Sequence, residues 1–571
     1  MRSKTLKRII IFGFFLLVAG LFYTQIIKGT YYYKLSEKNR IRLVPIKGPR
    51  GIIQDRNGKI IVENKLSLDV VVVPQELKDK EQAFARLSEI LKVPEEELYA
   101  KYKKKYLAPF APITLASNID KKTAMIIEEE KVWMPGVMVQ PQPIRFYVDN
   151  GTCAHVIGFL SEISKEELHR LREYGYKMKD LVGKSGIEKT YDFYIRGEDG
   201  GKQLEVDNRG KIVRMLGSKE PKVGKDITLT IDLDIQERAE ELLRGYKGAV
   251  VVMNPNTGEV LALASYPDFD PNDFLNTDSR DKVVELIKSS QRPMLNRAIG
   301  GLYPPGSTFK IITATSALET KAITPYSTFT CNGSFYPGRE GFKCWNTDGH
   351  GPQDLSSGIA HSCNVYFFNV GRAAGPDNIS KYATLFGLGK QTGIDLPGEK
   401  KGLVPSRLWR KTKTRKNWYE GDTLNFSIGQ GDLLVTPIQM VSAVSCIANG
   451  GYAVQPFIIK KIDNVEATRV KMRKISISDA TIKSIKQAMI GTVENEGGTG
   501  ARAKIEGLTF AAKTGTAQAR GGSHAWYLGF APANNPKVSF IVFLEHGGSG
   551  GAIPADIVRG ILEKMREKQM L

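Results

Sequence analysis

An apolar run near the N-terminus predicts a membrane anchor. Residues from Ile9 to Ile27 carry no charge, and a run of this length is about enough to cross a bilayer as a helix. No small-x-small cleavage site follows it, and no second apolar stretch of that length occurs. We therefore expect an uncleaved single-pass anchor in the cell (inner) membrane, with the residues after about Lys28 on the extracytoplasmic side. The basic residues that favour a cytoplasmic N-terminus are Arg2, Lys4, Lys7 and Arg8.

Short β-rich runs dominate the segment that follows. Two of them flank "DRNG", in which Asn57-Gly58 is a strong hairpin-turn signal. Apolar positions spaced by about 3.6 residues predict helix from about Gln75 to Lys105. The stretches "VIGFLSEIS" and "GKSGIEKTYDFYIRGEDGGKQLEVDNRG" predict further short strands. No set of catalytic groups occurs before about residue 220, so we expect this region to serve in spacing and docking.

A different pattern follows and predicts a domain of mixed helices and strands. A β-branched run ends at Ile231, and either Asp232 or Asp234 then caps an amphipathic helix. The segments "GAVVVMN" and "GEVLALASY" predict two strands joined by a turn. Much later, "KVSFIVFLEH" predicts another strand, followed by a helix from about Ala555 to Lys568. This arrangement predicts a sheet closed by strands from both ends of the segment.

The stretch "YPPGSTFKII" places a serine after a tight turn and a lysine three residues later. If Ser307 begins a helix, Lys310 lies on the same face, one turn below it. A serine hydroxyl needs a nearby base to become a good nucleophile, and burial or a second cation lowers a lysine pKa toward the range that a base requires. Alone, however, the S-x-x-K pattern also occurs by chance in many unrelated helices.

Two further motifs make a chance occurrence of the S-x-x-K pattern improbable. "AHSCNVYFF" supplies S-x-N, and "AAKTGTAQ" supplies K-T-G in a strand-like context. S-x-x-K, S-x-N and K-T-G in this order form the set of the penicilloyl serine transferases. The predicted catalytic residues are Ser307, Lys310 and Ser362. The predicted substrate-binding residues are Asn364, Lys513, Thr514, Gly515 and Thr516.

Each of these positions suits a chemical role. Ser362 can pass a proton between Lys310 and a leaving amine, and Asn364 can hold a substrate amide. Lys513 adds positive charge that attracts a substrate carboxylate and lowers the amine pKa of Lys310. Gly515 leaves room for an extended peptide beside its strand. The backbone N–H groups that we expect to form an oxyanion hole are those of Ser307 and Thr516.

The chain resembles a class B penicillin-binding protein, specifically the elongation-type penicillin-binding protein 2, over nearly its whole length. "RGIIQDRNGKIIVEN" and "GKSGIEKTYDFYIRGEDG" are similar to the family's membrane-proximal region, and "VVMNPNTGEVLALASYPDFDPN", "GLYPPGSTFK", "SIGQGDLLVTPIQM" and "HAWYLGFAP" to its transpeptidase domain. The resemblance implies an α/β (α+β) transpeptidase domain with an antiparallel sheet flanked by helices, an elongated β-rich pedestal and one N-terminal transmembrane helix. The implied bounds are 1–8 for a cytoplasmic tail, 9–27 for the anchor, 28–224 for the pedestal and 225–571 for the transpeptidase domain.

This resemblance implies a serine-type D,D-transpeptidase that cross-links peptidoglycan stem peptides during cell elongation and shape maintenance. Ser307 would attack the D-Ala-D-Ala bond, release D-Ala and pass the acyl group to an amine of a second strand, without a cofactor. D,D-carboxypeptidase side activity and covalent inhibition by β-lactams are also implied, as is partnership with a SEDS-type glycosyltransferase and other elongation-complex membrane proteins. Two alternatives are a β-lactam or muropeptide sensor and a non-catalytic activator of a glycan polymerase.

Three of the five cysteines lie with a histidine in one short stretch. Three thiolates and an imidazole form a tetrahedral structural zinc set, and some elongation-type relatives are similar in carrying a metal site in this insert. Cys363 lies between two motif residues, so an extended backbone would aim it away from substrate while a metal braces the loop. A Cys331–Cys344 disulfide is the competing interpretation. The candidate zinc ligands are Cys331, Cys344, His350 and Cys363.

The net charge of the chain bears on whether it binds an anionic partner. The net charge is +20, and a basic balance favours an anionic partner surface. The chain lacks Cys/His finger spacing and aromatic-basic nucleic-acid motifs, so we expect no nucleic-acid partner. We interpret the basic stretch "RKTKTRKNWYEGD", residues 410–422, as a solvated loop near the rim of the active site.

Overall fold

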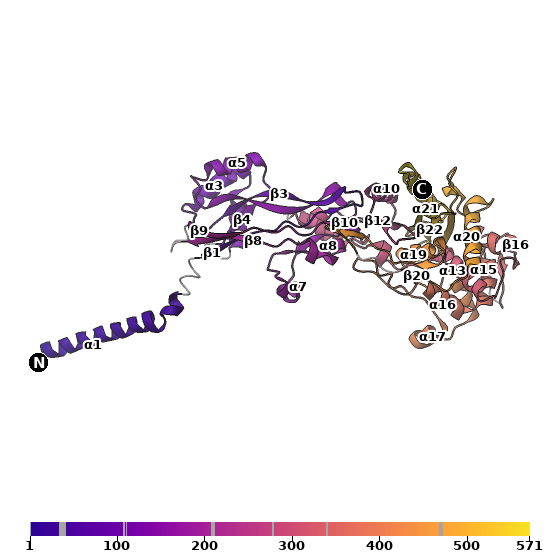
Figure 1. The fold of residues 1–571 in the computed structure, drawn as a ribbon, viewed down its shortest axis with the longest axis horizontal. Coiled ribbons are helices and arrows are strands. Elements are labelled where there is room, and N and C mark those ends of the chain that lie inside the picture. Colours follow the sequence, from indigo (N-terminus) through magenta and orange to yellow (C-terminus); the bar gives the residue numbers. More distant parts are fainter. Residues whose placement is uncertain are drawn as a thin grey trace. The chain divides into compact units, whose positions relative to one another are not determined.

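The computed structural model describes residues 2–33, 41–106, 109, 111–206, 212–276, 279–338, 341–467 and 472–571. The chain forms two compact units, and each combines segments that are distant in sequence (Figure 1). The first unit comprises Met1–Gly51, Asn64–Phe146 and Arg196–Lys225. The second comprises Ile52–Glu63, Tyr147–Ile195 and Asp226–Leu571.

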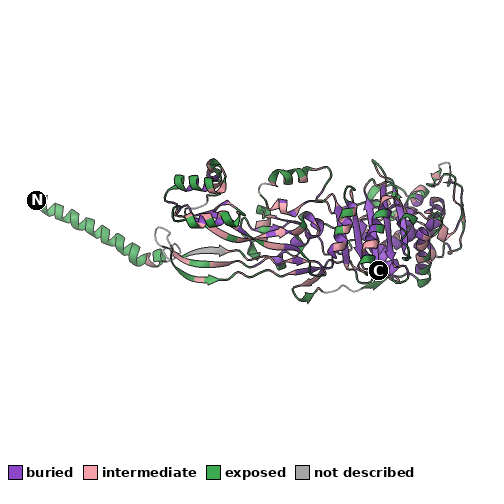
Figure 2. Ribbon diagram, turned by 90° about the horizontal axis from the view of Figure 1, so that it is seen from above, coloured by how far each residue is buried: buried purple, intermediate pink, exposed green. Residues whose placement is uncertain are grey.

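The N-terminal helix has the length and composition predicted for a membrane anchor. Helix α1 (Arg2–Phe22) continues into a π-helical turn, η1 (Tyr23–Ile27). The side chains from Ser3 to Ile27 are exposed (Figure 2). Within the described part of the chain, Ser3–Ile27 is the one helical stretch long and apolar enough to span a bilayer.

The first unit contains two sets of paired strands and a small helical layer. Strands β1 (Ile41–Ile46), β8 (Gly200–Val206) and β9 (Ile212–Lys219) form an antiparallel sheet in that order. The later residues of β3 (Ile60–Val72) pair with β4 (Ile113–Ala116) and β5 (Val137–Tyr147). Val70, Phe84 and Ile127 belong to the core beneath the helices. These helices are α3 (Lys80–Leu91), α4 (Glu95–Lys105) and α5 (Lys121–Glu130).

The helix predicted from Gln75 to Lys105 is two helices, so that prediction is wrong in its continuity. Lys92 ends α3 in the left-handed region, with φ 55°. Pro94 then precedes α4 and has no N–H to continue the ladder of hydrogen bonds. The apolar spacing holds on both sides of this break, which is why the pattern alone suggested one helix.

The stretch predicted as short strands around Tyr191 is partly helical. Short strands β6 (Leu160–Glu162) and β7 (Leu181–Gly183) do pair, but α8 (Gly186–Thr190) and α9 (Asp192–Ile195) follow them. Ile187 and Ile195 are fully buried, and with Tyr191 they recur every four residues, which is a helical spacing.

The predicted hairpin at Asn57-Gly58 is confirmed. Strand β2 (Ile53–Gln54) pairs antiparallel with the first residues of β3. Gly58 has φ 88°, which glycine adopts without strain. The Asp55 carboxylate accepts hydrogen bonds from the backbone N–H groups of Asn57 and Lys59, both at 2.8 Å.

The second unit is built on a five-stranded antiparallel sheet in the order β12-β11-β23-β22-β21. The sequence placed three of these strands correctly, and strands from both ends of the segment do share one sheet. The bounds are β11 (Gly248–Met253), β12 (Val260–Tyr266), β21 (Ala511–Ala517), β22 (His524–Ala531) and β23 (Val538–Leu544).

Helices cover both faces of this sheet, so its strands are buried on each side (Figure 2). Val250 and Val252 belong to the core with α10 (Leu233–Leu243) and α21 (Ile553–Glu567). Val251 faces the opposite core, which includes α13 (Lys310–Glu319) and α19 (Pro437–Ala448). Asp232, one of the two predicted caps, accepts from the backbone of Ile235 at the start of α10.

The remaining elements of the second unit surround this framework. Its other helices are α6 (Ala154–Ile157), α7 (Lys165–Leu171), α11 (Arg280–Lys288), α12 (Arg297–Gly300), α14 (Leu355–Ala360), α15 (Asn364–Ala374), α16 (Pro376–Leu385), α17 (Arg407–Trp409), α18 (Glu420–Ser427) and α20 (Asp479–Glu494). Its short strands are β10 (Ile227–Leu229), β13 (Phe329–Cys331), β14 (Ser334–Phe335), β15 (Phe342–Lys343), β16 (Gly351–Gln353), β17 (Tyr452–Ala453), β18 (Ile459–Ile462), β19 (Val465–Glu466) and β20 (Arg473–Lys474).

Truncation of a buried side chain in the central sheet should lower the stability of the protein strongly. Ile541→Ala in β23 removes a side chain that is fully buried, so we expect the free energy of unfolding to fall by about 2–5 kcal/mol. Val465→Ala in the edge strand β19, where Val465 is exposed, should change it by less than about 0.5 kcal/mol. Thermal unfolding of the two variants checks this, and equal midpoints would contradict the assignment of the core.

Candidate active site

The predicted nucleophile lies on a tight turn at the start of α13. Residues Gly306–Phe309 form a 3-10 turn, η6, that leads directly into the helix. In a 3-10 turn, residues three apart eclipse one another, so Lys310 lies below Ser307 as predicted. Ser307 is half-buried, and its hydroxyl makes no hydrogen bond within the described residues.

Glycine lets this turn approach two other segments. Gly306 has φ 55°, and a Cβ there would lie 2.7 Å from the Thr516 carbonyl oxygen of β21. Its N–H donates to the Gly429 carbonyl at 3.0 Å. A Cβ on Gly429 would lie 2.1 Å from the Gly306 carbonyl oxygen. Both contacts therefore require the absence of a side chain.

The amine of Lys310 is fully buried and held from three directions. Its Nζ donates to the Ser362 carbonyl oxygen at 2.7 Å, to Ser362 Oγ at 3.3 Å and to Asn364 Oδ1 at 2.7 Å. An ammonium has three N–H donors, so these acceptors match it fully. Burial lowers the pKa of Lys310 to about 8, so a fraction of the amine is neutral near physiological pH.

The Ser362–Asn364 turn owes its shape to the end of α14. The Ser362 N–H donates to the Ile359 carbonyl and the Cys363 N–H to the Gly358 carbonyl, which is the Schellman pattern of a helix C-terminus. That pattern places Ser362 in the left-handed region, with φ 54°, so the extended backbone predicted around Cys363 does not include Ser362. The left-handed turn brings both the Ser362 carbonyl and its hydroxyl to Lys310.

Lys513 is also fully buried, on strand β21. Its Nζ donates to the Thr514 carbonyl oxygen at 2.9 Å. Burial, and next the charge of Lys310, lower the pKa of Lys513 well below its ordinary value. Burial is likewise the main cause of the low pKa of Lys310. The sequence suggested burial or a second cation, Lys513, as the cause, and burial dominates.

The role predicted for Gly515 needs correction. A Cβ at Gly515 would lie 2.9 Å from Thr308 Cγ2 and 3.1 Å from the Pro305 carbonyl oxygen. A side chain at this position would therefore point toward the serine turn. Side chains of a strand point to its two faces, so this one would not point along the open edge of β21. Glycine here allows β21 to pack against η6; it does not clear space beside the strand.

The edge of β21 remains suited to an extended ligand. Among the described strands, β21 pairs only with β22, and an edge strand offers backbone groups to a further chain. Thr516 is exposed on it, and Thr514 Oγ1 donates to Thr499 Oγ1 at 2.7 Å.

Sequence reasoning missed the contacts that fix the turn before Ser307. The Trp526 indole, fully buried on β22, donates to the Pro304 carbonyl at 3.0 Å. The Tyr303 hydroxyl donates to Glu545 Oε1 at 2.7 Å, and Arg297 pairs with the same carboxylate oxygen at 2.9 Å. The only sequence signal was the tryptophan, since a buried indole N–H usually finds a partner.

The structure brings the four predicted zinc ligands together. Their donor atoms all lie within 4.8 Å of one another. His350 Nδ1 is 3.6 Å from Cys331 Sγ and 3.5 Å from Cys344 Sγ. Both the donor types and the spacing fit a tetrahedral zinc site, in which sulfur atoms lie about 3.8 Å apart. None of the five cysteines forms a disulfide in the structure.

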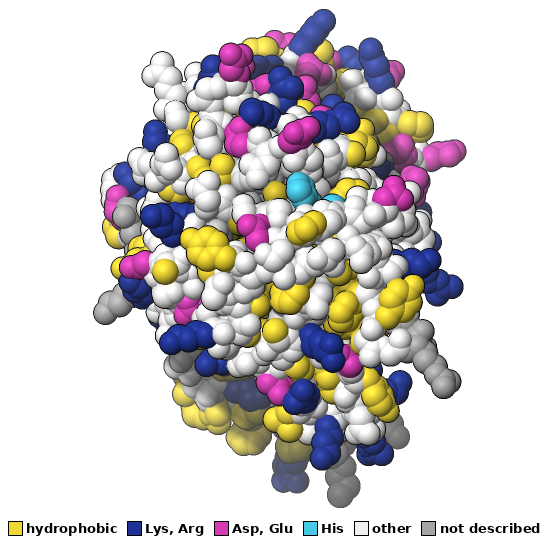
Figure 3. Space-filling view, turned by 90° about the vertical axis from the view of Figure 1, so that its right-hand side faces the viewer, with side chains coloured by type: hydrophobic (Ala, Val, Ile, Leu, Met, Phe, Trp, Pro, Cys, Tyr) yellow, Lys and Arg dark blue, Asp and Glu magenta, His cyan; other side chains and the backbone are white. Residues whose placement is uncertain are grey.

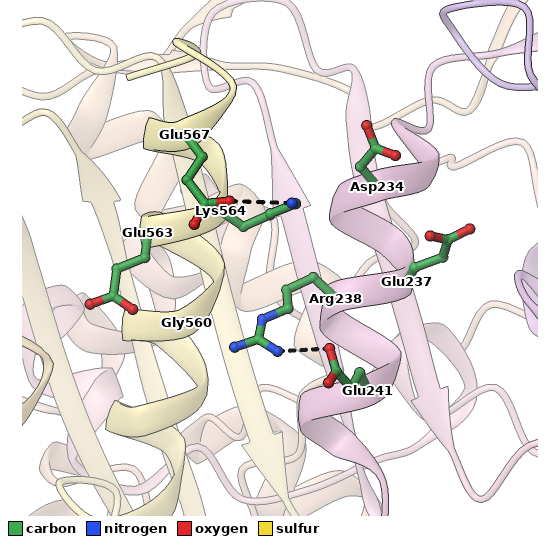
Figure 4. Close-up of a pocket in the computed structure, with 8 residues that line it drawn as sticks. All are labelled: Asp234, Glu237, Arg238, Glu241, Gly560, Glu563, Lys564 and Glu567. Atoms are coloured by element: carbon green, nitrogen blue, oxygen red, sulfur yellow. Dashed lines mark hydrogen bonds and ion pairs between the residues drawn. The ribbon is translucent and has the colours of Figure 1, made fainter.

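A separate pocket lies on the opposite face of the sheet, between α10 and α21. It encloses about 490 Å³ and contains none of the predicted site residues. Figure 4 shows that its polar walls are partly self-paired, through Arg238 with Glu241 and Lys564 with Glu567. The catalytic candidates therefore form a different site.

Comparisons with known proteins agree with this geometry. The penicillin binding protein transpeptidase domain matches residues 248–563, and the penicillin-binding protein dimerisation domain matches residues 45–229. The peptidoglycan D,D-transpeptidase MrdA of Salmonella typhimurium is 34% identical over 601 residues, covering 99% of this chain and 96% of the relative.

Two solved structures are similar across most of the chain. One is the complex between penicillin-binding protein PBP2 and MreC from Helicobacter pylori, with TM-score 0.83 and 29% identity over 93% of this chain and 100% of that one. The other describes polymerization and crosslinking by a peptidoglycan synthase complex, with TM-score 0.76 and 28% identity over 99% and 98% of the two chains. The protein therefore belongs to the elongation-type penicillin-binding protein 2 family of peptidoglycan D,D-transpeptidases.

Proposed function

We propose that Ser307 is the nucleophile with which this transpeptidase opens the D-Ala-D-Ala bond of a peptidoglycan stem peptide. The observation that carries the proposal is the buried amine of Lys310, one turn below Ser307 and in hydrogen-bond contact with Ser362 and Asn364. A lysine with a pKa of about 8 is neutral often enough to act as a base. Hydrogen bonds to Ser362 and Asn364 hold the Lys310 amine in position inside the protein.

Acylation follows from this arrangement. As Ser307 Oγ bonds to the carbonyl carbon of the penultimate D-Ala, its proton passes to neutral Lys310 Nζ. The tetrahedral intermediate collapses, the C–N bond breaks, and the departing D-Ala amine receives a proton through Ser362. The product is an ester between Ser307 and the shortened stem peptide. In the second half, an amine of another strand attacks the ester carbonyl carbon and gives up a proton to Lys310 Nζ. An amide bond forms, the ester C–O bond breaks, and the proton passes to Ser307 Oγ.

Substrate binding falls to β21. A stem peptide paired with its open edge would place its backbone beside Thr514, Gly515 and Thr516. The N–H groups of Ser307 and Thr516 are suited to an oxyanion hole, since Gly306 keeps the two backbones in close approach. Lys513 lies under the strand, where the terminal carboxylate of the substrate would favour its protonated, positively charged form.

The Cys331, Cys344, His350 and Cys363 cluster would hold a structural zinc ion. Zinc bound by three thiolates and one imidazole is a closed site that contributes to folding and leaves no position for substrate. The Asn364 N–H donates to Cys344 Sγ at 3.4 Å, so the cluster is joined directly to the loop that contacts Lys310. The acyl transfer itself uses no cofactor.

The same family membership supports an assignment for the rest of the chain. Residues 1–8 would form a cytoplasmic tail, 9–27 a single-pass anchor in the cell membrane, 28–224 the pedestal and 225–571 an extracytoplasmic transpeptidase domain. Relatives in solved structures are described in a complex with MreC and as part of a peptidoglycan synthase complex. We extend this to a SEDS-type glycosyltransferase and other elongation-complex membrane proteins as partners, with β-lactams as covalent inhibitors.

Covalent labelling tests the nucleophile. Ser307→Ala should abolish both labelling by a fluorescent penicillin and formation of cross-links, because it removes the hydroxyl that forms the ester. Ser316→Ala, a control in the same helix whose hydroxyl is buried without a hydrogen bond among the described residues, should retain labelling. Mass mapping of the penicillin-bound peptide should locate the adduct at Ser307, and an adduct elsewhere would end the proposal.

The lowered pKa of Lys310 predicts how acylation depends on pH. The base is the neutral amine, so the rate of penicillin acylation should rise with pH and level off above about pH 8. At pH 7 the rate should be roughly tenfold below its plateau, since about one amine in ten is neutral there. Stopped-flow acylation from pH 6 to 9, with thermal midpoints measured alongside, gives the profile. A flat profile in folded protein would exclude Lys310 as the base.

Metal analysis tests the zinc site. The purified chain should contain one zinc ion and, after denaturation with chelator, five free thiols. Cys331→Ser should lose zinc and lower the thermal midpoint, because structural zinc contributes to folding. Cys446→Ser, at a buried thiol outside the cluster, should keep zinc. Absence of zinc together with only three free thiols would establish the disulfide instead.

A further inference from the structure

A basic segment projects from the second unit between α16 and α18. Residues 407–416, which we name the basic projection, comprise α17 and a π-helical turn, η7 (Arg410–Thr414). The sequence analysis treated this stretch as a solvated loop. The structure instead gives it helical form, and π-helical turns are rare and frequently lie at functional sites. In Figure 1, α17 lies at the lower edge of its unit.

Some of the cations in the basic projection have partners. Arg410 pairs with Asp422 at 2.9 Å and Asp432 at 3.4 Å, and its guanidinium lies 5.7 Å from the centre of the Trp418 ring. Arg407 pairs with Asp377 at 3.6 Å. These contacts hold the projection against the rest of the unit.

Four other cations on the projection are exposed and make no ion pair within the described residues. The nearest acidic side chains in sequence are already paired: Asp422 with Arg410, and Glu420 with Arg372 at 2.8 Å. Figure 3 shows basic and acidic side chains interspersed over the face of the molecule that it presents. The unpaired cations are Lys411, Lys413, Arg415 and Lys416.

The basic projection is fixed to the structure that carries Ser307. Arg410 contacts Asp432, which lies in the same loop as Gly429, and the Gly429 carbonyl accepts from the N–H of Gly306. In addition, Phe426 of α18 stacks on Phe309 of the serine turn, with ring centroids 5.3 Å apart. The base of the basic projection is therefore linked, through Arg410 and α18, to the segments that pack against the serine turn.

We propose that the basic projection binds the carboxylates of uncross-linked stem peptides on a peptidoglycan strand, and so recruits that strand to the site. This inference rests on the proposed function. Each uncross-linked stem peptide ends in a carboxylate, so a strand presents negative charges at intervals. Several exposed lysine charges on flexible stems suit such a ligand, because they contact many carboxylates in turn and raise the local concentration of strands.

A strand is favoured over a membrane or nucleic acid as the occupant. The basic projection is linked through Asp432 and Gly429 to the turn of the nucleophile, so it belongs to the same unit as Ser307 and can bind the same strand. The substrate of that serine is itself a polyanion of regularly spaced carboxylates. A lipid surface or a nucleic acid at this position would gain nothing from the neighbouring chemistry.

Charge removal tests this proposal in the full-length protein. The combined variant Lys411→Gln, Lys413→Gln and Lys416→Gln should bind soluble uncross-linked peptidoglycan strands about tenfold more weakly at low ionic strength, as expected for loss of three exposed ion pairs. Arg415 is left unchanged, so the variant keeps one of the four exposed cations. A matched control, Lys103→Gln, Lys121→Gln and Lys122→Gln, removes the same charge from exposed positions of the first unit and should bind like the unaltered chain.

A second arm changes the ligand instead of the protein. Strands whose carboxylates have been converted to amides should bind the unaltered chain as weakly as the normal strands bind the triple variant, and the two losses should not add. The active fraction of every sample is titrated with labelled penicillin. If the unaltered chain takes no label, the proposed function fails, whereas a labelled protein whose strand binding ignores both changes overturns only this inference.

Two further probes separate the sources of negative charge. Phosphatidylglycerol vesicles and single-stranded DNA are compared with the strands under the same salt conditions. A tenfold loss of strand binding that exceeds any loss for vesicles and DNA supports the proposal. A loss confined to vesicles or to DNA overturns it in favour of that ligand.

Discussion

The buried amine of Lys310 is the interaction on which the catalytic geometry depends. Removing an ammonium from water is costly unless its donors are satisfied, and here Ser362 and Asn364 provide three acceptors. These hydrogen bonds therefore join α13 to the start of α15. Any movement of one relative to the other would leave a donor of the buried amine unpaired. The same burial that makes these contacts necessary lowers the pKa of Lys310 to about 8, so structural order and reactivity have one cause.

Close packing around Ser307 depends on glycine at three positions. Gly306 meets β21, Gly429 meets Gly306, and Gly515 meets η6, each at a distance that a Cβ would make impossible without movement. The serine turn thus packs closely against two segments, β21 and the loop that contains Gly429. Backbone N–H groups in such an arrangement are preorganised toward a developing negative charge. Bulk at any of the three positions would separate segments that the chemistry needs together.

Much of this could be predicted from the sequence, and the exceptions have a common origin. The sequence placed β11, β12 and β23 because each is a short, continuous apolar run that is buried on both faces. It placed α21 because the apolar residues of that segment recur at helical spacing. The three motifs identified residues that the fold does bring together. The helix break at Pro94 and the helical spacing around Tyr191 were also visible in the sequence but were outweighed by stronger local patterns.

What the sequence did not reveal was contact between distant segments. That Gly515 faces Thr308, that Trp526 holds Pro304 and that Glu545 lies between Tyr303 and Arg297 all depend on how β21, β22 and β23 pack against the serine turn. The hydrophobic periodicity of a local segment does not encode contacts with segments that are distant in sequence. The left-handed turn at Ser362 was only partly predictable. The Schellman hydrogen bonds that cause it are local, but they could be expected only if the end of α14 were already known.

The turn at Ser362 also explains why a cysteine cluster would lie so close to the catalytic groups. Ser362 and Asn364 contact the amine of Lys310, while Cys363 between them contributes its thiol to the cluster on the other side. A left-handed residue costs about 1 kcal/mol or more outside glycine, so this turn persists only if its surroundings fix it. Hydrogen bonds to Lys310 fix one side. Ligation of Cys363 would fix the other, and the metal would thereby stabilise the backbone geometry on which proton transfer depends without touching the substrate.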